Sequence, residues 1–154
     1  MSAAYFWYYL EILIARLSQS KYIQNIIMTT SVNKQDESIF EYCIDNNILF
    51  KGGSENYVLE RVFHATEKYN TDELVKISGD WPLIDFRMVD NFTEIFNKNY
   101  PSSRIVSNTG PEISMPWGFD VQVYKLDELK YIIEISSVEM EKEHLSHWFY
   151  NPKN

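Results

Sequence analysis

The acidic residues of the segment 78–90, SGDWPLIDFRMVD, are the first candidates for chemistry. Asp80 follows the apolar run ELVKIS (73–78), which predicts a buried strand, and Pro82 stiffens the turn that comes next. Ligands of open α/β sheets bind beyond the carboxyl ends of the strands, and a carboxylate there suits a hard cation such as Mg²⁺, which in turn binds phosphates. The alternative is a turn aspartate that hydrogen-bonds its own backbone. Asp85 is predicted to cap a new helix.

A second acid and a glycine pair are weaker candidates. Asp120 enters the apolar run of PWGFDVQVY (116–124), either as a functional carboxylate or as an ordinary acid at a strand entrance. The segment KGGS (51–54) places a glycine pair before a helix start, where the backbone can approach an anion, although such pairs are common in plain turns.

Metal and nucleophile motifs are otherwise weak. His144 and His147 in EKEHLSHW (141–148) lie one helical turn apart, but they lack the i, i+4 spacing of the common zinc protease motif and have no cysteine partner. Neither Cys43 nor any serine lies in a recognisable nucleophile elbow. The sequence therefore does not favour a zinc site or a covalent mechanism.

Composition limits the classes of function. A chain of 154 residues is long enough for one domain with a real core, and a net charge of −8 argues against binding nucleic acid through its phosphates. One cysteine cannot form an internal disulfide, which favours a reducing, cytoplasmic compartment. The apolar segment 4–17 is too short to span a bilayer and lacks the basic residues of a signal peptide or a membrane-surface helix. We expect a buried, aromatic-rich helix there.

The elements that must position these residues alternate along the chain. Apolar residues spaced three or four apart predict helices, and β-branched runs predict strands. The expected helices are 5–18, 33–47, 55–69 (with Ser54 as N-cap), 86–99, 126–135 and 140–150; the expected strands are 25–31, 48–50, 73–78, 104–108 and 119–125. Such alternation favours an α/β fold in which a mostly parallel sheet has helices on both faces.

Four segments together resemble the cytidylyltransferase family of sugar-activating enzymes, in particular the spore coat polysaccharide branch. ISGDWPLID resembles the family's strand-end motif, and PWGFDVQVY resembles its P-x-G-x-D-V-x-V-F segment. KGGSENYVLERV resembles R-G-S-x-x-D-V-L-x-R, and EKEHLSHWFYNP resembles the R-E-H-V-T segment. No one motif is decisive, but all four occur in the family's order and spacing between Tyr9 and Asn154.

The resemblance implies a fold, a reaction and a set of site residues. The fold would be a three-layer α/β/α sandwich of the nucleotide-diphospho-sugar transferase type, which is Rossmann-like. The reaction would transfer CMP from CTP to a sugar or sugar acid, with Mg²⁺ as cofactor and pyrophosphate as product. By resemblance the site residues are Asp80 as catalytic residue and magnesium ligand; Gly53, Ser54 and Lys76 for the nucleotide; and Asn108, Asp120, Glu143 and His144 for the sugar.

Departures from the family pattern accompany these matches. Met1 leads almost directly into the first family helix, so the first strand and the basic phosphate-binding loop are expected to be missing. Asn154 comes before the region that carries a second metal-binding aspartate in related enzymes. Lys76 and Lys142 stand where the family tends to have arginine, and Tyr57 stands where it tends to have aspartate. Lysine keeps the charge but loses the two-pronged grip on phosphate.

The sequence predicts a single but incomplete domain, truncated at both ends. Without the first strand, the strands at 25–31 and 73–78 lose their shared partner, so we expect them to pair directly or to be bridged by another chain. The primary hypothesis is a magnesium-dependent cytidylyltransferase, weak or inactive as this chain alone. The alternative is a non-catalytic remnant that keeps the fold as a sugar-binding or interaction module. Neither hypothesis requires nucleic acid or a membrane, and both are compatible with a homo-oligomer.

Overall fold

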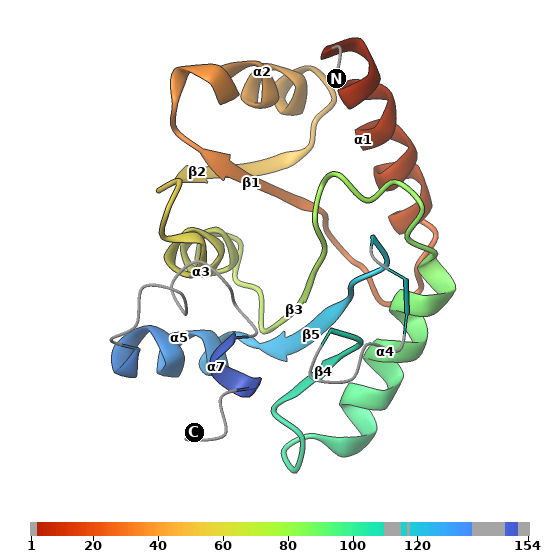
Figure 1. The fold of residues 1–154 in the computed structure, drawn as a ribbon, viewed down its shortest axis with the longest axis vertical. Coiled ribbons are helices and arrows are strands. Elements are labelled where there is room, and N and C mark those ends of the chain that lie inside the picture. The colour runs from red at the N-terminus through yellow and green to blue at the C-terminus, as the bar shows by residue number, and fades with distance from the viewer. Residues whose placement is uncertain (1–2, 110–114, 117, 137–146, 151–154) are drawn as a thin grey trace. The chain divides into compact units, whose positions relative to one another are not determined.

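The elements alternate as the sequence predicts. The computed structural model describes residues 3–109, 115–116, 118–136 and 147–150 (Figure 1). Its helices are α1 (Ala3–Leu17), η1 (Lys34–Asp36, a 3₁₀ turn), α2 (Glu37–Asp45), α3 (Val58–Lys68), α4 (Phe86–Asn99), α5 (Leu126–Ile135) and α7 (His147–Tyr150). Its strands are β1 (Ile27–Ser31), β2 (Leu49–Gly53), β3 (Glu73–Lys76), β4 (Ile105–Ser107) and β5 (Gln122–Lys125).

The chain forms two compact units, each made from segments far apart in the sequence. The first unit contains residues 1–26 and 75–124, and the second contains residues 27–74 and 125–154. The boundary between them passes through β3 and β5. Each unit has its own packing, described below in turn.

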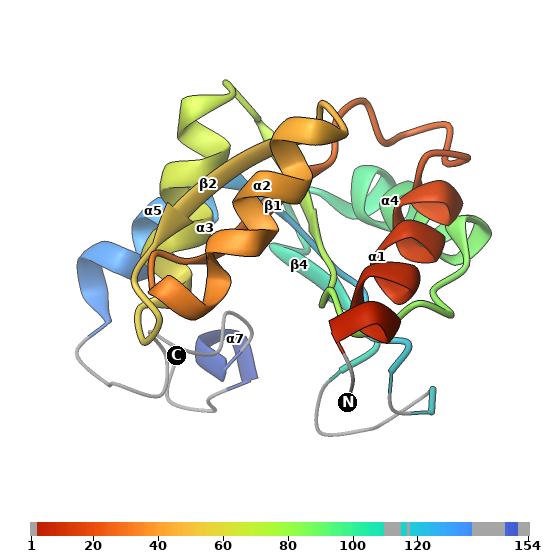
Figure 2. The same ribbon diagram turned by 90° about the horizontal axis from the view of Figure 1, so that it is seen from above.

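The first unit is built around the apolar faces of α1 and α4, which pack against each other (Figure 2). Residues spaced three and four apart place Leu10, Leu13 and Leu17 on one face of α1, where all three are buried. Helix α4 also packs on β4. The core cluster consists of Leu13, Leu17, Ile84, Val89, Phe96, Val121 and Val123. The buried apolar helix expected near the N-terminus is thus confirmed.

The cap of α4 confirms the role predicted for Asp85. Its carboxylate accepts a hydrogen bond from the backbone N–H of Arg87 at 2.8 Å, and the Arg87 guanidinium donates to the same carboxylate at 2.7 and 2.9 Å. Arg16 of α1 approaches it at 3.6 Å and donates its Nε–H to the Ile84 carbonyl at 2.7 Å. These groups hold the pKa of Asp85 well below its usual range, with the Arg87 hydrogen bonds as the main cause.

Because of this cap, we expect part of the free energy of unfolding to depend on pH. Asp85→Ala is expected to lower the free energy of unfolding by about 1 kcal/mol at pH 7, the usual loss for an N-cap. Because the folded pKa lies below the unfolded value, the contribution is present above about pH 4 and is lost as the pH falls through the folded pKa. Urea unfolding from pH 7 to pH 3 measures the difference between wild type and variant. Asp45→Ala, at the exposed end of α2, is the control; an Asp85→Ala difference that stays constant to pH 3 would contradict the prediction.

The second unit has a parallel β1–β2 pair with α2 and α3 on its opposite sides (Figure 1). The register joins Thr30 to Gly52 and Ser31 to Gly53. The expected strand end at residue 50 is therefore wrong, because β2 continues through both glycines. A Cβ at Gly52 would lie 2.8 Å from Val32 Cγ1, and one at Gly53 would lie 2.8 Å from Arg61 Cγ. At these two positions glycine lets Val32 and Arg61 pack closely on the strand, and it does not end the strand.

Helix α3 begins later than the sequence predicts. It starts at Val58, and its N-cap position is Tyr57, whose side chain makes no cap hydrogen bond. Ser54 Oγ instead accepts from the backbone N–H of Tyr57 at 3.1 Å. Ser54 therefore closes a turn that precedes the helix, four residues before Val58, and the prediction that it caps the helix directly is wrong.

The strands form two sheets, with orders β1-β2 and β3-β5-β4. Strands β4 and β5 are antiparallel, with Ser107 opposite Gln122. Among the described strands, β1 and β3 each lie at the edge of a sheet, so the direct pairing that we considered for them is not present. Bridging by a strand of another chain stays a prediction. No helix in the described ranges combines the length and the apolar character needed to cross a bilayer.

Candidate active site

The turn after β3 presents Asp80 at the end of a strand, as the sequence predicts. The Asp80 carboxylate is exposed and accepts a hydrogen bond from Ser78 Oγ at 2.5 Å. The turn itself is closed by backbone bonds from Trp81 N to Ser78 O and from Ile84 N to Trp81 O, both 3.3 Å. Asp80 thus lies in a turn and offers a carboxylate to solvent, and the partner of that carboxylate is the Ser78 side chain rather than the backbone of the turn. Its role as a magnesium ligand stays a prediction.

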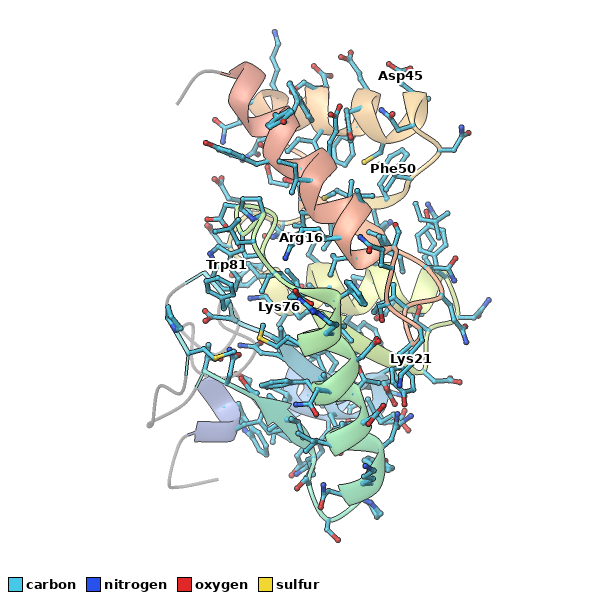
Figure 3. All side chains as sticks on the ribbon, turned by 90° about the vertical axis from the view of Figure 1, so that its right-hand side faces the viewer. Arg16, Lys21, Asp45, Phe50, Lys76 and Trp81 are labelled. Carbon is cyan, nitrogen blue, oxygen red and sulfur yellow. The ribbon has the colours of Figure 1, made fainter. Side chains whose placement is uncertain are left out.

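Lys76, the last residue of β3, provides the cation of this region (Figure 3). Its side chain is half-buried, and loss of solvation lowers the pKa of its ammonium. The carboxylates of Asp120 and, to a smaller extent, Asp80 act in the opposite direction and favour the charged form. Lys76, Asp80 and Asp120 are called the Lys76 cluster below.

Asp120 precedes β5 and completes the cluster. Its side chain is half-buried, and burial raises the pKa of its carboxyl group, while the charge of Lys76 lowers it. The cluster therefore holds one ammonium near two carboxylates, within a single unit of the chain. Such an arrangement can contact an anionic substrate through Lys76 and a cation or a hydroxyl group through the carboxylates.

The electrostatic coupling in the cluster is measurable. Asp120→Asn is expected to lower the pKa of Lys76 further, because the variant removes the stronger of the two charges that stabilise the ammonium. Titration of the Lys76 ¹³Cε resonance by NMR measures the change. The matched variant Asp80→Asn should lower the same pKa by less. An unchanged Lys76 pKa in Asp120→Asn would show that the two groups do not interact.

Asn108, predicted to contact the sugar, has a different environment. The residue is 4% exposed and directly follows β4. Its Nδ2 donates to the Phe119 carbonyl at 2.7 Å, and its Oδ1 accepts from the backbone N–H of Val121 at 2.8 Å. Both functional groups of this amide thus have backbone partners, in the residues just before and just after Asp120.

The two glycine-segment residues, Gly53 and Ser54, lie in the second unit at the end of β2. The Ser54 side chain is exposed, and its carbonyl accepts from Arg61 Nη1 at 2.9 Å. Arg61 itself packs against Gly53. These residues follow the carboxyl end of a parallel strand, which is the edge where α/β sheets bind ligands.

Sequence reasoning missed a polar cluster at the neighbouring strand end. Asp36 accepts from Ser31 Oγ at 2.6 Å and from Thr30 Oγ1 at 2.9 Å, both at the end of β1. These bonds, that of Ser31 above all, and the charge of Arg61 lower the pKa of Asp36, while burial opposes them. The available signal was a Thr-Ser pair after an apolar run, followed by an acid at a helix start.

Two of the predicted site residues cannot be placed relative to the Lys76 cluster. Glu143 and His144 lie outside the described residues, as does most of the two-histidine segment. Within the part of the chain that the structure describes, there is no cluster of three His, Cys, Asp or Glu side chains able to hold a metal ion. Arg87, which could have served a phosphate, is engaged with Asp85.

The sequence profile of the cytidylyltransferases matches residues 9–140, which is most of the chain. This protein belongs to the cytidylyltransferase family. An uncharacterized protein of Methanocaldococcus jannaschii is 30% identical over 148 residues, which are 94% of this chain and 57% of that protein. The spore coat polysaccharide biosynthesis protein SpsF of Bacillus subtilis is 29% identical over 85 residues, which are 53% of this chain and 35% of SpsF.

Solved structures agree with this family and its fold. A cytidylyltransferase from Leptospira borgpetersenii superposes with a TM-score of 0.86 at 26% identity, covering 94% of this chain and 60% of that one. A CMP:2-keto-3-deoxy-manno-octonic acid synthetase complexed with CTP gives a TM-score of 0.60 at 12% identity, covering 87% and 70%, and supports the fold alone. The expected α/β fold of the nucleotide-sugar transferase type is confirmed for this chain. The chain spans 57% and 35% of the two curated relatives that it matches.

Proposed function

We propose that this protein transfers CMP from CTP to a sugar or sugar acid and that the Lys76 cluster is part of its active site. In the reaction, a hydroxyl oxygen of the sugar forms a bond to the α-phosphorus of CTP. The bond from that phosphorus to the oxygen that bridges it to the β-phosphorus breaks, the hydroxyl proton passes to solvent, and pyrophosphate leaves. The observation that supports the proposal best is the half-buried Lys76 near two carboxylates, at a strand end of a cytidylyltransferase-family chain.

The cluster residues would have separate roles. Lys76 would neutralise part of the triphosphate charge, and its half-buried position would strengthen that contact relative to a surface lysine. Asp120 would face the sugar. Because Lys76 is a single ammonium rather than a guanidinium, it would act as a point charge and would not hold two phosphate oxygens in a fixed geometry.

A magnesium ion fits this site only together with the substrate. Mg²⁺ in nucleotide enzymes is commonly bound by one or two carboxylates, several waters and the phosphates themselves. Asp80 is an exposed carboxylate of this kind, and no third acid joins it among the described residues. When bound, the ion would neutralise the triphosphate and orient it for in-line displacement. The protein's part is to hold the Asp80 carboxylate in place through Ser78.

The alternative, a non-catalytic module of the same fold, is favoured by one observation. Two of the cations nearest to the predicted site residues in the sequence are engaged within the protein, since Arg61 donates to Ser54 and Arg87 donates to Asp85. Fewer cations then remain to neutralise a triphosphate. A sugar-binding surface would not need them.

Pyrophosphate release distinguishes the two functions. The chain is incubated with CTP, Mg²⁺ and a panel of sugar acids and neutral sugars, and pyrophosphate is measured by a coupled assay. The proposal predicts release that depends on CTP and on one class of sugar, that is lower with ATP or UTP, and that stops with EDTA. No release and no CTP-induced shift of the thermal unfolding midpoint would overturn it, and a thermal shift with a sugar alone would support the binding module.

A further inference from the structure

Asn108 lies where the β4–β5 ladder would continue. The ladder pairs Ile105 with Tyr124 and Ser107 with Gln122, so the next position opposite Asn108 is Val121. At this position the side-chain amide of Asn108 makes the cross-strand hydrogen bonds that backbone groups make in the ladder. Like a peptide group, the Asn108 amide has an N–H donor and a carbonyl acceptor: it donates to the carbonyl of Phe119 and accepts from the N–H of Val121.

These two bonds act on the peptide groups at either side of one residue. The Phe119 carbonyl belongs to the peptide group before the Asp120 Cα, and the Val121 N–H belongs to the peptide group after it. Holding both peptide groups restricts φ and ψ of Asp120 together. The direction of a Cα–Cβ bond follows from φ and ψ, so the same two bonds also restrict where the carboxylate can extend.

The surroundings make this restraint firm. Asn108 is 4% exposed and Val121 is fully buried, so water cannot easily replace either bond. Gln122, which follows Val121, is also restrained by its side chain, because its Nε2 donates to Thr109 Oγ1 at 3.0 Å. Thr109 is itself fixed, because its backbone N–H donates to Ser107 Oγ at 3.0 Å. Asp120, by contrast, is half-buried and interacts electrostatically with Lys76.

We propose that Asn108 is a positioning residue, whose side-chain amide fixes the backbone of Asp120 and thereby directs the Asp120 carboxylate toward Lys76. Its contribution to catalysis rests on the proposed function, whereas its effect on the geometry of Asp120 does not. Asn108 would therefore act on the reaction through Asp120 rather than by touching the sugar itself.

A double-mutant cycle tests the geometric role without any need for activity. The readout is the position of the Lys76 ¹³Cε and ¹⁵Nζ resonances at pH 7, in wild type, Asn108→Ala, Asp120→Asn and the double variant. We expect Asn108→Ala to shift these resonances toward their positions in Asp120→Asn, and to shift them no further in the Asp120→Asn background. A folded Asn108→Ala protein with wild-type Lys76 resonances, or equal shifts in both backgrounds, would overturn the proposal.

Two further variants keep this test decisive. Ser20→Ala is the matched control, because Ser20 is also a buried polar residue of the first unit, and its Oγ accepts from the backbone N–H groups of Tyr22 and Ile23 at 3.2 Å. It should lower stability without moving the Lys76 resonances. If Asn108→Ala does not fold, Asn108→Ser, which keeps a hydroxyl, replaces it in the same cycle.

The catalytic part is tested separately by pyrophosphate release. Asn108→Ala is expected to reduce the rate about 10–100-fold, as small displacements of a reacting group do. In the Asp120→Asn background it should cause little further loss. If wild type releases no pyrophosphate, the proposed function fails while the resonance cycle still decides the role of Asn108. If wild type is active and Asn108→Ala reduces release equally in both backgrounds, Asn108 does not act through Asp120.

Discussion

Asp80→Asn is expected to reduce CTP-dependent pyrophosphate release by about 10²–10³-fold, the range seen when one preorganised electrostatic group is removed from an active site. The substitution keeps the size of the side chain but removes the charge that would hold a cation against the triphosphate. The loss should lie mainly in the rate at saturating CTP, because the charge acts where negative charge is redistributed in the transition state. Initial rates over a range of CTP concentrations measure it.

The structure offers a matched control for this variant. Asp72 is an exposed aspartate just before β3, at the opposite end of the strand that leads to Asp80. Asp72→Asn removes the same charge beside the other end of β3 and is expected to leave the rate within about twofold of wild type, as surface substitutions usually have small effects. Equal activity of Asp80→Asn and Asp72→Asn would remove Asp80 from the catalytic machinery.

Phe96→Ala is expected to lower the free energy of unfolding by about 3–5 kcal/mol, the usual loss for a buried phenylalanine. Phe96 is fully buried in the core of the first unit, and its ring lies 5.5 Å from that of Tyr100. Removing the ring leaves a cavity between α4 and its neighbours that the closely packed core can fill only in part. The urea midpoint should fall while the slope of the transition stays the same.

The neighbouring residue on the same helix provides the comparison. Ile95 is 40% exposed, so Ile95→Ala removes a large apolar side chain from α4 without opening a buried cavity. Its expected loss is about 1 kcal/mol or less, from the smaller area that returns to water. Similar losses for the two variants would mean that the α4 face assigned to the core is wrong.

Periodicity predicted the order of the described elements of this chain, although not the end of β2 or the start of α3. Leu10, Leu13 and Leu17 lie on the buried face of α1 because their spacing matches the helical repeat, and the Asp85 cap could be predicted from its place before a helical run. The conformation of the glycine pair was harder to predict, because Gly52 and Gly53 lie in a strand where neighbouring side chains pack too closely for a Cβ atom. Local patterns do not show that Val32 and Arg61 approach them.

Site residues whose partners are distant in the sequence were the least predictable. Asn108 could be selected as a polar residue after a strand, but its partners at Phe119 and Val121 lie 11 and 13 residues away. The Asp36 cluster was missed for a different reason: its partners Thr30 and Ser31 are only six and five residues away, but no motif indicates that this strand end turns back onto the acid. Lys76 and Asp80 were easier to select together, because only three residues of one strand end and turn lie between them.

The division of the chain into interleaved segments has a consequence for folding during synthesis. Helix α1 belongs to a unit whose second segment begins only at residue 75, so its apolar face lacks its helical partner α4 until that segment leaves the ribosome. At ordinary elongation rates the delay between Leu17 and Phe96 is on the order of ten seconds, far longer than the time in which a helix forms. The nascent chain therefore carries an amphipathic helix without its main packing partner during that interval, which makes α1 a segment that we expect chaperones to bind.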